Sequence, residues 1–164
     1  MSHYYLDASA LVKRYVGETG SDWLQAIIAP SRTLLLFTSR MTIVEVVSAF
    51  ARRLRDGSLT TEEFAAAHDA FRADCLSEVQ IMPPTLAVVD LACILLEHHP
   101  LRAYDAVHLA TALEAREFLT SRGYPPLTFI SADERLNQAA EAEGLAVDNP
   151  HRHLHVDQRT AGRI

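Results

Sequence analysis

The chain has 164 residues, of which 49% are hydrophobic, and it has a formal net charge of −6 at pH 7. A chain near this length buries roughly 70% of its unfolded surface and forms one compact domain. The sequence contains no apolar run of about 18 residues and no signal-like start, so we expect a cytoplasmic protein without a membrane segment. The negative charge argues against a protein that coats nucleic acid, because phosphate binding depends on lysine and arginine.

Apolar strands and amphipathic helices alternate in the first part of the chain. His3 to Leu6 is a short aromatic and apolar run that predicts a strand, and a turn and a helix follow over residues 7–15. Helical periodicity predicts a second helix over residues 21–29. A buried strand is predicted at residues 34–37 and a third helix over residues 41–55.

The second part of the chain repeats this alternation. Thr60 and Glu63 form a capping box at the start of a helix, and a weak strand follows at residues 79–82. Helices are next predicted over residues 86–97 and 103–122. The last unit is a strand, a second capping box, a helix and a final short strand, at residues 127–130, 131–134, 134–144 and 145–147.

Short strands separated by helices predict an α/β fold, because parallel crossovers need about a dozen residues and cover both faces of a sheet. We place the domain at residues 1–148 and expect residues 149–164 to be a mobile tail. His151, His153 and His155 alternate in that tail, which favours adventitious metal binding. Cys75 and Cys93 lack metal-ligand spacing and are predicted core residues.

Two acids follow predicted strands. Asp7 comes after the first strand and Asp133 after the fourth. Ligands of open parallel sheets bind beyond the carboxyl ends of the strands, so both acids are expected at one edge. The alternative is that each only caps a helix, where an acid contributes up to about 1 kcal/mol.

Two further acids lie in apolar helices. Glu45 is flanked by β-branched residues, and burying its charge unpaired would cost several kcal/mol, so it needs either a metal ion or a basic partner such as Arg52. Asp105 begins an alanine-rich helix, where a first-turn acid is the simpler alternative. Four clustered acids would repel one another unless a cation joined them. Hard oxygen ligands select Mg²⁺ or Mn²⁺, and the lack of Cys/His spacing argues against zinc.

Four stretches in this order resemble the PIN-domain family, and within it the VapC-type toxins of type II toxin–antitoxin pairs. The likeness spans residues 3 to about 148. The stretches are Tyr5-Leu-Asp-Ala-Ser-Ala-Leu-Val-Lys13, the helix with Glu45, Tyr104-Asp-Ala-Val-His-Leu-Ala-Thr-Ala-Leu113 and Phe129-Ile-Ser-Ala-Asp-Glu-Arg-Leu136.

The resemblance implies a three-layer α/β/α sandwich with a five-stranded parallel sheet. It also implies a homodimeric divalent-metal endoribonuclease that acts on tRNA, rRNA or mRNA and is blocked by a VapB-like antitoxin. By the same resemblance the metal ligands are Asp7, Glu45, Asp105 and Asp133. Ser9 and Ser131 look like the hydroxyl residues that support them, with helix capping as the alternative.

Some residues and functions stay open at this point. His108 is either a substrate contact or a hydrogen-bonded structural residue, and Arg40 or Arg102 could contact RNA. The basic groups at residues 13–14 and 52–55 either solvate helix faces or bind phosphate. One rival function is a catalytically silent binding module. Another is a haloacid-dehalogenase-like phosphatase, which needs a second aspartate where Ser9 stands.

Overall fold

The computed structural model describes residues 2–29 and 34–153. Five parallel strands form one sheet in the order β3-β2-β1-β4-β5. Their bounds are β1 Ser2–Leu6, β2 Leu34–Ser39, β3 Val79–Met82, β4 Thr128–Ile130 and β5 Ala146–Asp148. The predicted parallel α/β sheet is therefore confirmed.

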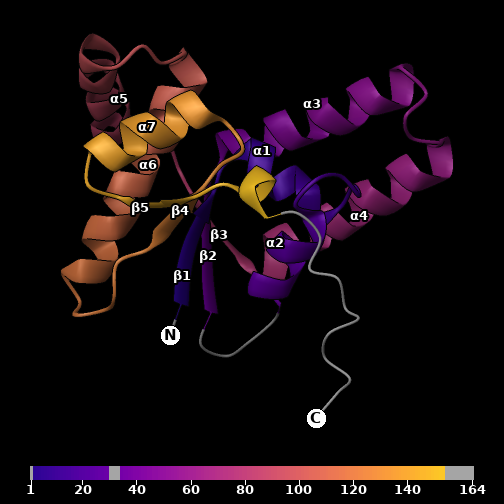
Figure 1. Cartoon of the computed structure of the whole chain (residues 1–164), viewed down its shortest axis with the longest axis horizontal. Coiled ribbons are helices and arrows are strands. Elements are labelled where there is room, and N and C mark those ends of the chain that lie inside the picture. The colour runs from indigo at the N-terminus through magenta and orange to yellow at the C-terminus, as the bar shows by residue number, and fades with distance from the viewer. Residues whose placement is uncertain (1, 30–33, 154–164) are drawn as a thin grey trace.

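Helices cover both faces of this sheet (Figure 1). The elements α1 to α4 lie on one side, and α5 to α7 lie on the other. Their bounds are α1 Ala8–Leu11, η1 Val12–Arg14, α2 Ser21–Ile27, α3 Met41–Arg55, α4 Thr61–Ser77, α5 Leu86–His98, α6 Ala103–Thr120, α7 Glu134–Ala142 and η2 Pro150–Arg152, where η marks a 3₁₀ turn. Within the described residues, none of these helices combines the length and the apolar run needed to cross a bilayer.

The alternation of side chains along the strands builds two separate cores. Tyr5 and Phe129 point to one face and pack with residues of α5, α6 and α7. Leu6 and Ile130, their neighbours in the chain, point to the other face and pack with residues of α1 to α4. Successive strand residues face opposite sides of a sheet, so two buried faces require nearly continuous apolar strands. This arrangement is the expected three-layer α/β/α sandwich.

Two local predictions are wrong. Ser131 does not open a capping box with Glu134, because the N-cap of this helix lies two residues later, at Asp133, which accepts from the backbone N–H groups of Arg135 and Leu136. Cys93 is exposed on α5 instead of lying in the core. By contrast, the capping box that opens α4 is confirmed.

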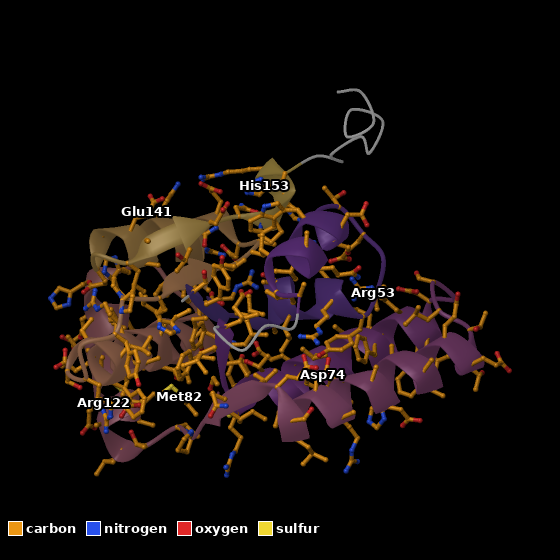
Figure 2. All side chains as sticks on the ribbon, turned by 90° about the horizontal axis from the view of Figure 1, so that it is seen from below. Arg53, Asp74, Met82, Arg122, Glu141 and His153 are labelled. Atoms are coloured by element: carbon orange, nitrogen blue, oxygen red, sulfur yellow. The ribbon has the colours of Figure 1, made fainter. Side chains whose placement is uncertain are left out.

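Residues 149–153, at the start of the predicted tail, pack against the N-terminal part of the domain. Asn149 caps η2, and His153 stacks on the ring of Trp23 with a centroid distance of 3.9 Å. Figure 2 shows His153 at the last described turn, above the indigo N-terminal elements. Residues 149–153 therefore have defined contacts with the domain, which the sequence did not predict. His155 and the other residues after 153 lie outside the described residues, and the domain boundary stays a prediction.

Candidate active site

The strand order places the end of β1 beside the end of β4. Leu6 pairs with Ile130 at the last register position, and the Asp7 N–H donates to the Ile130 carbonyl at 3.2 Å. The chain leaves β1 toward β2 on one side, while β4 continues toward β5 on the other. Such a reversal of strand order leaves a crevice at the carboxyl ends of the strands, where ligands of open α/β sheets bind.

A cleft of about 740 Å³ lies at this position. Its walls come from α1, η1, α3, the start of α6 and the start of α7, together with η2. All four predicted acids line it: Asp7, Glu45, Asp105 and Asp133. Residues separated by up to 126 positions in the sequence are thus brought to one cavity.

Asp7 is the most buried of these acids, with 5% of its surface exposed. The Ser131 hydroxyl donates to Oδ2 at 2.7 Å, and the Ala10 N–H donates to Oδ1 at 2.9 Å. The Ser9 hydroxyl lies 2.8 and 2.9 Å from the two oxygens. Burial raises the pKa of Asp7 above its ordinary value, and it outweighs the opposing effects of His108 and of these hydrogen bonds.

Asp105 and Asp133 both serve as helix caps. Asp133 uses Oδ1 for the two N–H groups at the start of α7, and its Oδ2 has no hydrogen bond to any described residue. Asp105 accepts from the Arg102 N–H at 3.2 Å through Oδ2. The capping alternative from the sequence is therefore observed for these two acids and for Asp7. In Asp105 and Asp133, capping occupies one carboxylate oxygen and leaves the other without a hydrogen bond to a described residue.

Glu45 has a different partner from the one predicted. The structure shows no ion pair between Glu45 and Arg52 within its described residues. Instead Glu45 Oε2 lies 2.6 Å from His108 Nε2, and His108 Nδ1 lies 3.0 Å from the Tyr5 hydroxyl. The structural alternative for His108 is thus observed, in a residue that also lines the cleft.

Basic side chains form another part of the cleft wall. Glu18 accepts from Lys13 Nζ at 2.7 Å and from Arg53 at 2.6 Å. Lys13 Nζ also donates to His151 Nε2 at 3.1 Å. Burial alone would raise the pKa of Glu18, but these two cations lower it below its ordinary value.

The structure shows which of the basic residues noted in the sequence line the cleft. Arg52 and Arg102 line the cleft, whereas Arg40 does not. Arg14 forms ion pairs with Asp74 and Glu78 instead of facing the cleft. Lys13, Arg52, Arg53 and Arg102 are therefore the cations of the cleft wall, and two of them, Lys13 and Arg53, are paired with Glu18.

The chemistry of the cleft suits a hard divalent cation. Its donors are carboxylate oxygens, burial raises the pKa of Asp7, and one oxygen of Asp133 has no hydrogen bond to a described residue. Among the residues that the structure describes, no three His, Cys, Asp or Glu side chains are grouped so that they could hold an ion as they stand.

Sequence reasoning missed the links that cross the sheet. His108 stands three residues after Asp105 on the same helical face, so the sequence could name it as a possible substrate contact, but its contacts with Glu45 and Tyr5 were not predicted. His151 was assigned to a mobile tail, and nothing in the local pattern predicted its contact with Lys13. Glu18 was not singled out, although an acid between Lys13 and Ser21 was visible.

The fold and this cleft define a class of protein: a three-layer α/β sandwich with an acid-lined cavity at the carboxyl edge of its parallel sheet. The sequence matches the PIN domain over residues 4–142. The chain therefore belongs to the PIN-domain family, and the resemblance noted from its motifs is confirmed.

Individual relatives agree with this assignment. The chain is 36% identical over 143 residues to ribonuclease VapC49 of Mycobacterium tuberculosis, covering 87% of this chain and 92% of that protein. Its fold is similar to M. tuberculosis VapC20, a sarcin-ricin loop cleaving toxin, with a TM-score of 0.59, 17% identity and coverage of 87% and 96%. It is also similar to a toxin–antitoxin complex from Klebsiella pneumoniae, with a TM-score of 0.57, 19% identity and coverage of 90% and 97%.

Proposed function

We propose that this protein is a divalent-metal-dependent endoribonuclease, the toxin of a VapBC-like pair, and that it hydrolyses RNA phosphodiester bonds. The observation that supports this most directly is that Asp7, Glu45, Asp105 and Asp133 all line one cleft. The family membership and the VapC relatives support the same reaction class. Mg²⁺ or Mn²⁺ held by these acids would polarise the phosphodiester and orient water, which would leave a 5′-phosphate and a 3′-hydroxyl.

The remaining residues of the cleft fit an RNA substrate. Ser9 and Ser131 fix the Asp7 carboxylate by hydrogen bonds, so its oxygens stay in place when a substrate binds. Arg52 and Arg102 are exposed residues of the cleft lining and supply positive charge for the RNA backbone. Bases in single-stranded loops are exposed for reading, which favours a loop as the cleaved element.

We also propose two protein partners. The similar toxin–antitoxin complex supports a VapB-like antitoxin that covers the cleft. Leu86, Val89, Ile94 and Leu96 on α5 are exposed, and they would suit the homodimer that the family resemblance implies.

The experiment is cleavage of a loop-bearing RNA by the purified protein in Mg²⁺ or Mn²⁺. We expect the cleavage rate of Asp7→Ala to fall by more than about 100-fold, beyond the tenfold to hundredfold effect usual for outer-shell residues. EDTA should abolish cleavage, and the exposed acid Glu141 provides the control Glu141→Ala, which should retain full activity. Cleavage that persists in EDTA, or in Asp7→Ala, would refute the metal mechanism. A wild-type protein without cleavage that still binds RNA or an antitoxin would favour the silent binding module.

A further inference from the structure

His108 contacts one of the proposed metal ligands without being one itself. We propose that His108 is a positioning residue that holds the Glu45 carboxylate by one oxygen, and that Tyr5 sets the imidazole tautomer needed for this contact. The inference rests on the proposed metal site and adds to it the residues that orient Glu45.

Three side chains from distant elements form a continuous chain of hydrogen bonds. Tyr5 comes from β1, Glu45 from α3 and His108 from α6. The Tyr5 hydroxyl contacts His108 Nδ1 at 3.0 Å, and His108 Nε2 contacts Glu45 Oε2 at 2.6 Å. Tyr5 is fully buried and His108 is 2% exposed, so the contact between them is shielded from water, while Glu45 at the other end is partly exposed.

The packing around Tyr5 fixes the far end of this chain. Its ring stacks on Phe129 with a centroid distance of 5.4 Å and an interplanar angle of 9°. The imidazole of His108 meets the Tyr5 ring edge-on at 78°. Rings held on two sides in a close-packed core lose their rotational freedom, so the hydroxyl presents a fixed donor to the imidazole.

The direction of the protons follows from the chemistry of the phenol. A tyrosine phenol has an ordinary pKa of about 10, so it keeps its hydrogen at neutral pH and can donate it. The phenol is therefore protonated and donates to Nδ1 of His108. A neutral imidazole that accepts at Nδ1 has its hydrogen at Nε2, and this N–H donates to Glu45 Oε2.

In this arrangement one oxygen of Glu45 accepts a hydrogen bond and the other can bind a metal ion. Oε2 accepts the His108 hydrogen bond, while Oε1 has no hydrogen bond to any described residue and is open to a cation. Carboxylates that bind metals are commonly held by such outer hydrogen bonds, and removing the outer partner weakens metal affinity by roughly 10–100-fold.

The test measures Mn²⁺ affinity of the full-length protein by isothermal titration calorimetry, which needs no catalytic activity. His108→Leu removes the donor, and we expect its Kd for Mn²⁺ to rise roughly 10–100-fold. His108→Gln retains an N–H donor and should lose less than about tenfold. Tyr5→Phe removes only the hydroxyl that sets the tautomer, and its affinity should lie between those of the wild type and His108→Leu.

The chain offers a matched control for the removal of a histidine–carboxylate pair. His99 Nε2 contacts Glu143 Oε1 at 2.7 Å, and neither residue lines the cleft. His99→Leu should therefore bind Mn²⁺ with wild-type affinity. A loss of affinity in His99→Leu equal to that in His108→Leu would overturn the positioning role, because the effect would then be one of general stability.

The outcomes separate this inference from the proposed metal site. If Glu45→Gln loses Mn²⁺ binding while His108→Leu binds normally, the site stands and the role of His108 is wrong. If the wild-type protein binds no Mn²⁺ at all, both proposals are wrong. Should His108→Leu fail to fold, Tyr5→Phe decides: reduced affinity supports the chain of hydrogen bonds, and unchanged affinity refutes it.

Discussion

Individual site residues could be predicted from the sequence where a charged side chain stands among apolar neighbours. Glu45 in an apolar helix needed a partner, and the structure provides one, but it is His108 and not Arg52. Arg52 lies seven residues away on the same helix, whereas His108 comes from α6, 63 positions along the chain. The local sequence identifies a buried charge that requires a partner, but only the fold determines which distant side chain becomes that partner.

The Asp7 carboxylate, which we propose as a metal ligand, lowers the stability of the folded protein when it is buried and ionised. Its pKa is raised on folding, so between its ordinary value of 3.8 and its value in the folded protein the native state binds more protons than the unfolded chain. Stability therefore falls as the pH rises through this interval, and the ionised carboxylate destabilises the metal-free protein at neutral pH.

We therefore predict that Asp7→Asn stabilises the metal-free protein at pH 7. The amide keeps the N-cap acceptor and removes the buried charge. A rise of a few degrees in Tm is expected, which corresponds to about 1 kcal/mol for a chain of this size. Thermal unfolding in EDTA should show the difference from the wild type shrinking as the pH falls toward the ordinary aspartate pKa of 3.8.

Asp56→Asn is a control at a carboxylate whose pKa shifts in the opposite direction. Hydrogen bonds from Ser58 lower the pKa of Asp56, so its charged form favours the folded state and its replacement should not stabilise the protein. If Asp7→Asn is less stable than the wild type at pH 7, burial does not dominate the behaviour of Asp7.

At the scale of elements, the sequence predicted where strands and helices lie, because periodicity and caps are local. It failed where an element depends on a contact from far along the chain. Residues 149–153 have no periodicity, yet they form η2 because His153 stacks on Trp23 and Pro150 packs against Gly20. The helix α7 begins at Glu134 with Asp133 as its N-cap, and the Ser131 hydroxyl contacts Asp7 and the Asp133 N–H instead of capping this helix.

Gly20 is the position that allows α2 and η2 to meet. It has a φ of +86°, and a Cβ atom there would lie 2.7 Å from the carbonyl carbon of Pro150. Gly20→Ala should therefore incur the left-handed backbone cost of about 1–2 kcal/mol together with the displacement of η2. We expect a larger loss of Tm than this backbone cost alone produces.

The control is Gly57→Ala, at a φ of +79° with no neighbouring atom within 4 Å of the added Cβ. It should incur the backbone cost only. Hydrogen exchange at residues 149–153 should accelerate in Gly20→Ala and stay unchanged in Gly57→Ala. Since His151 lines the cleft, release of η2 would also expose Lys13. Equal destabilisation by both substitutions would show that the contact with Pro150 contributes nothing.

At the scale of the whole molecule, charge distribution matters more than net charge. The chain has a net charge of −6, yet its cleft contains arginines and a lysine beside the four acids. Composition alone argued against a protein that coats nucleic acid and could not show that basic residues gather at the site. The family likeness covers residues 4–142, but it does not determine how the cleft charges balance in this chain.

This balance predicts that RNA binding depends on divalent ions beyond their effect on ionic strength. Without an ion, the acids repel the phosphates that Arg53 and Arg102 attract; with one, the local charge becomes positive. Fluorescence anisotropy with Ca²⁺ should show affinity at least about tenfold higher than in NaCl of matched ionic strength, equivalent to about 1.4 kcal/mol. Gel analysis would verify that the RNA stays intact.

Two substitutions that change the net charge equally separate the local effect from the global one. Glu45→Gln removes an acid from the cleft, while Glu141→Gln removes one from the exposed surface of α7, labelled in Figure 2. The gain in affinity from Ca²⁺ should shrink in Glu45→Gln and remain whole in Glu141→Gln. If both variants change the gain equally, RNA responds to the total charge of the molecule, and the cleft acids have no special part in binding it.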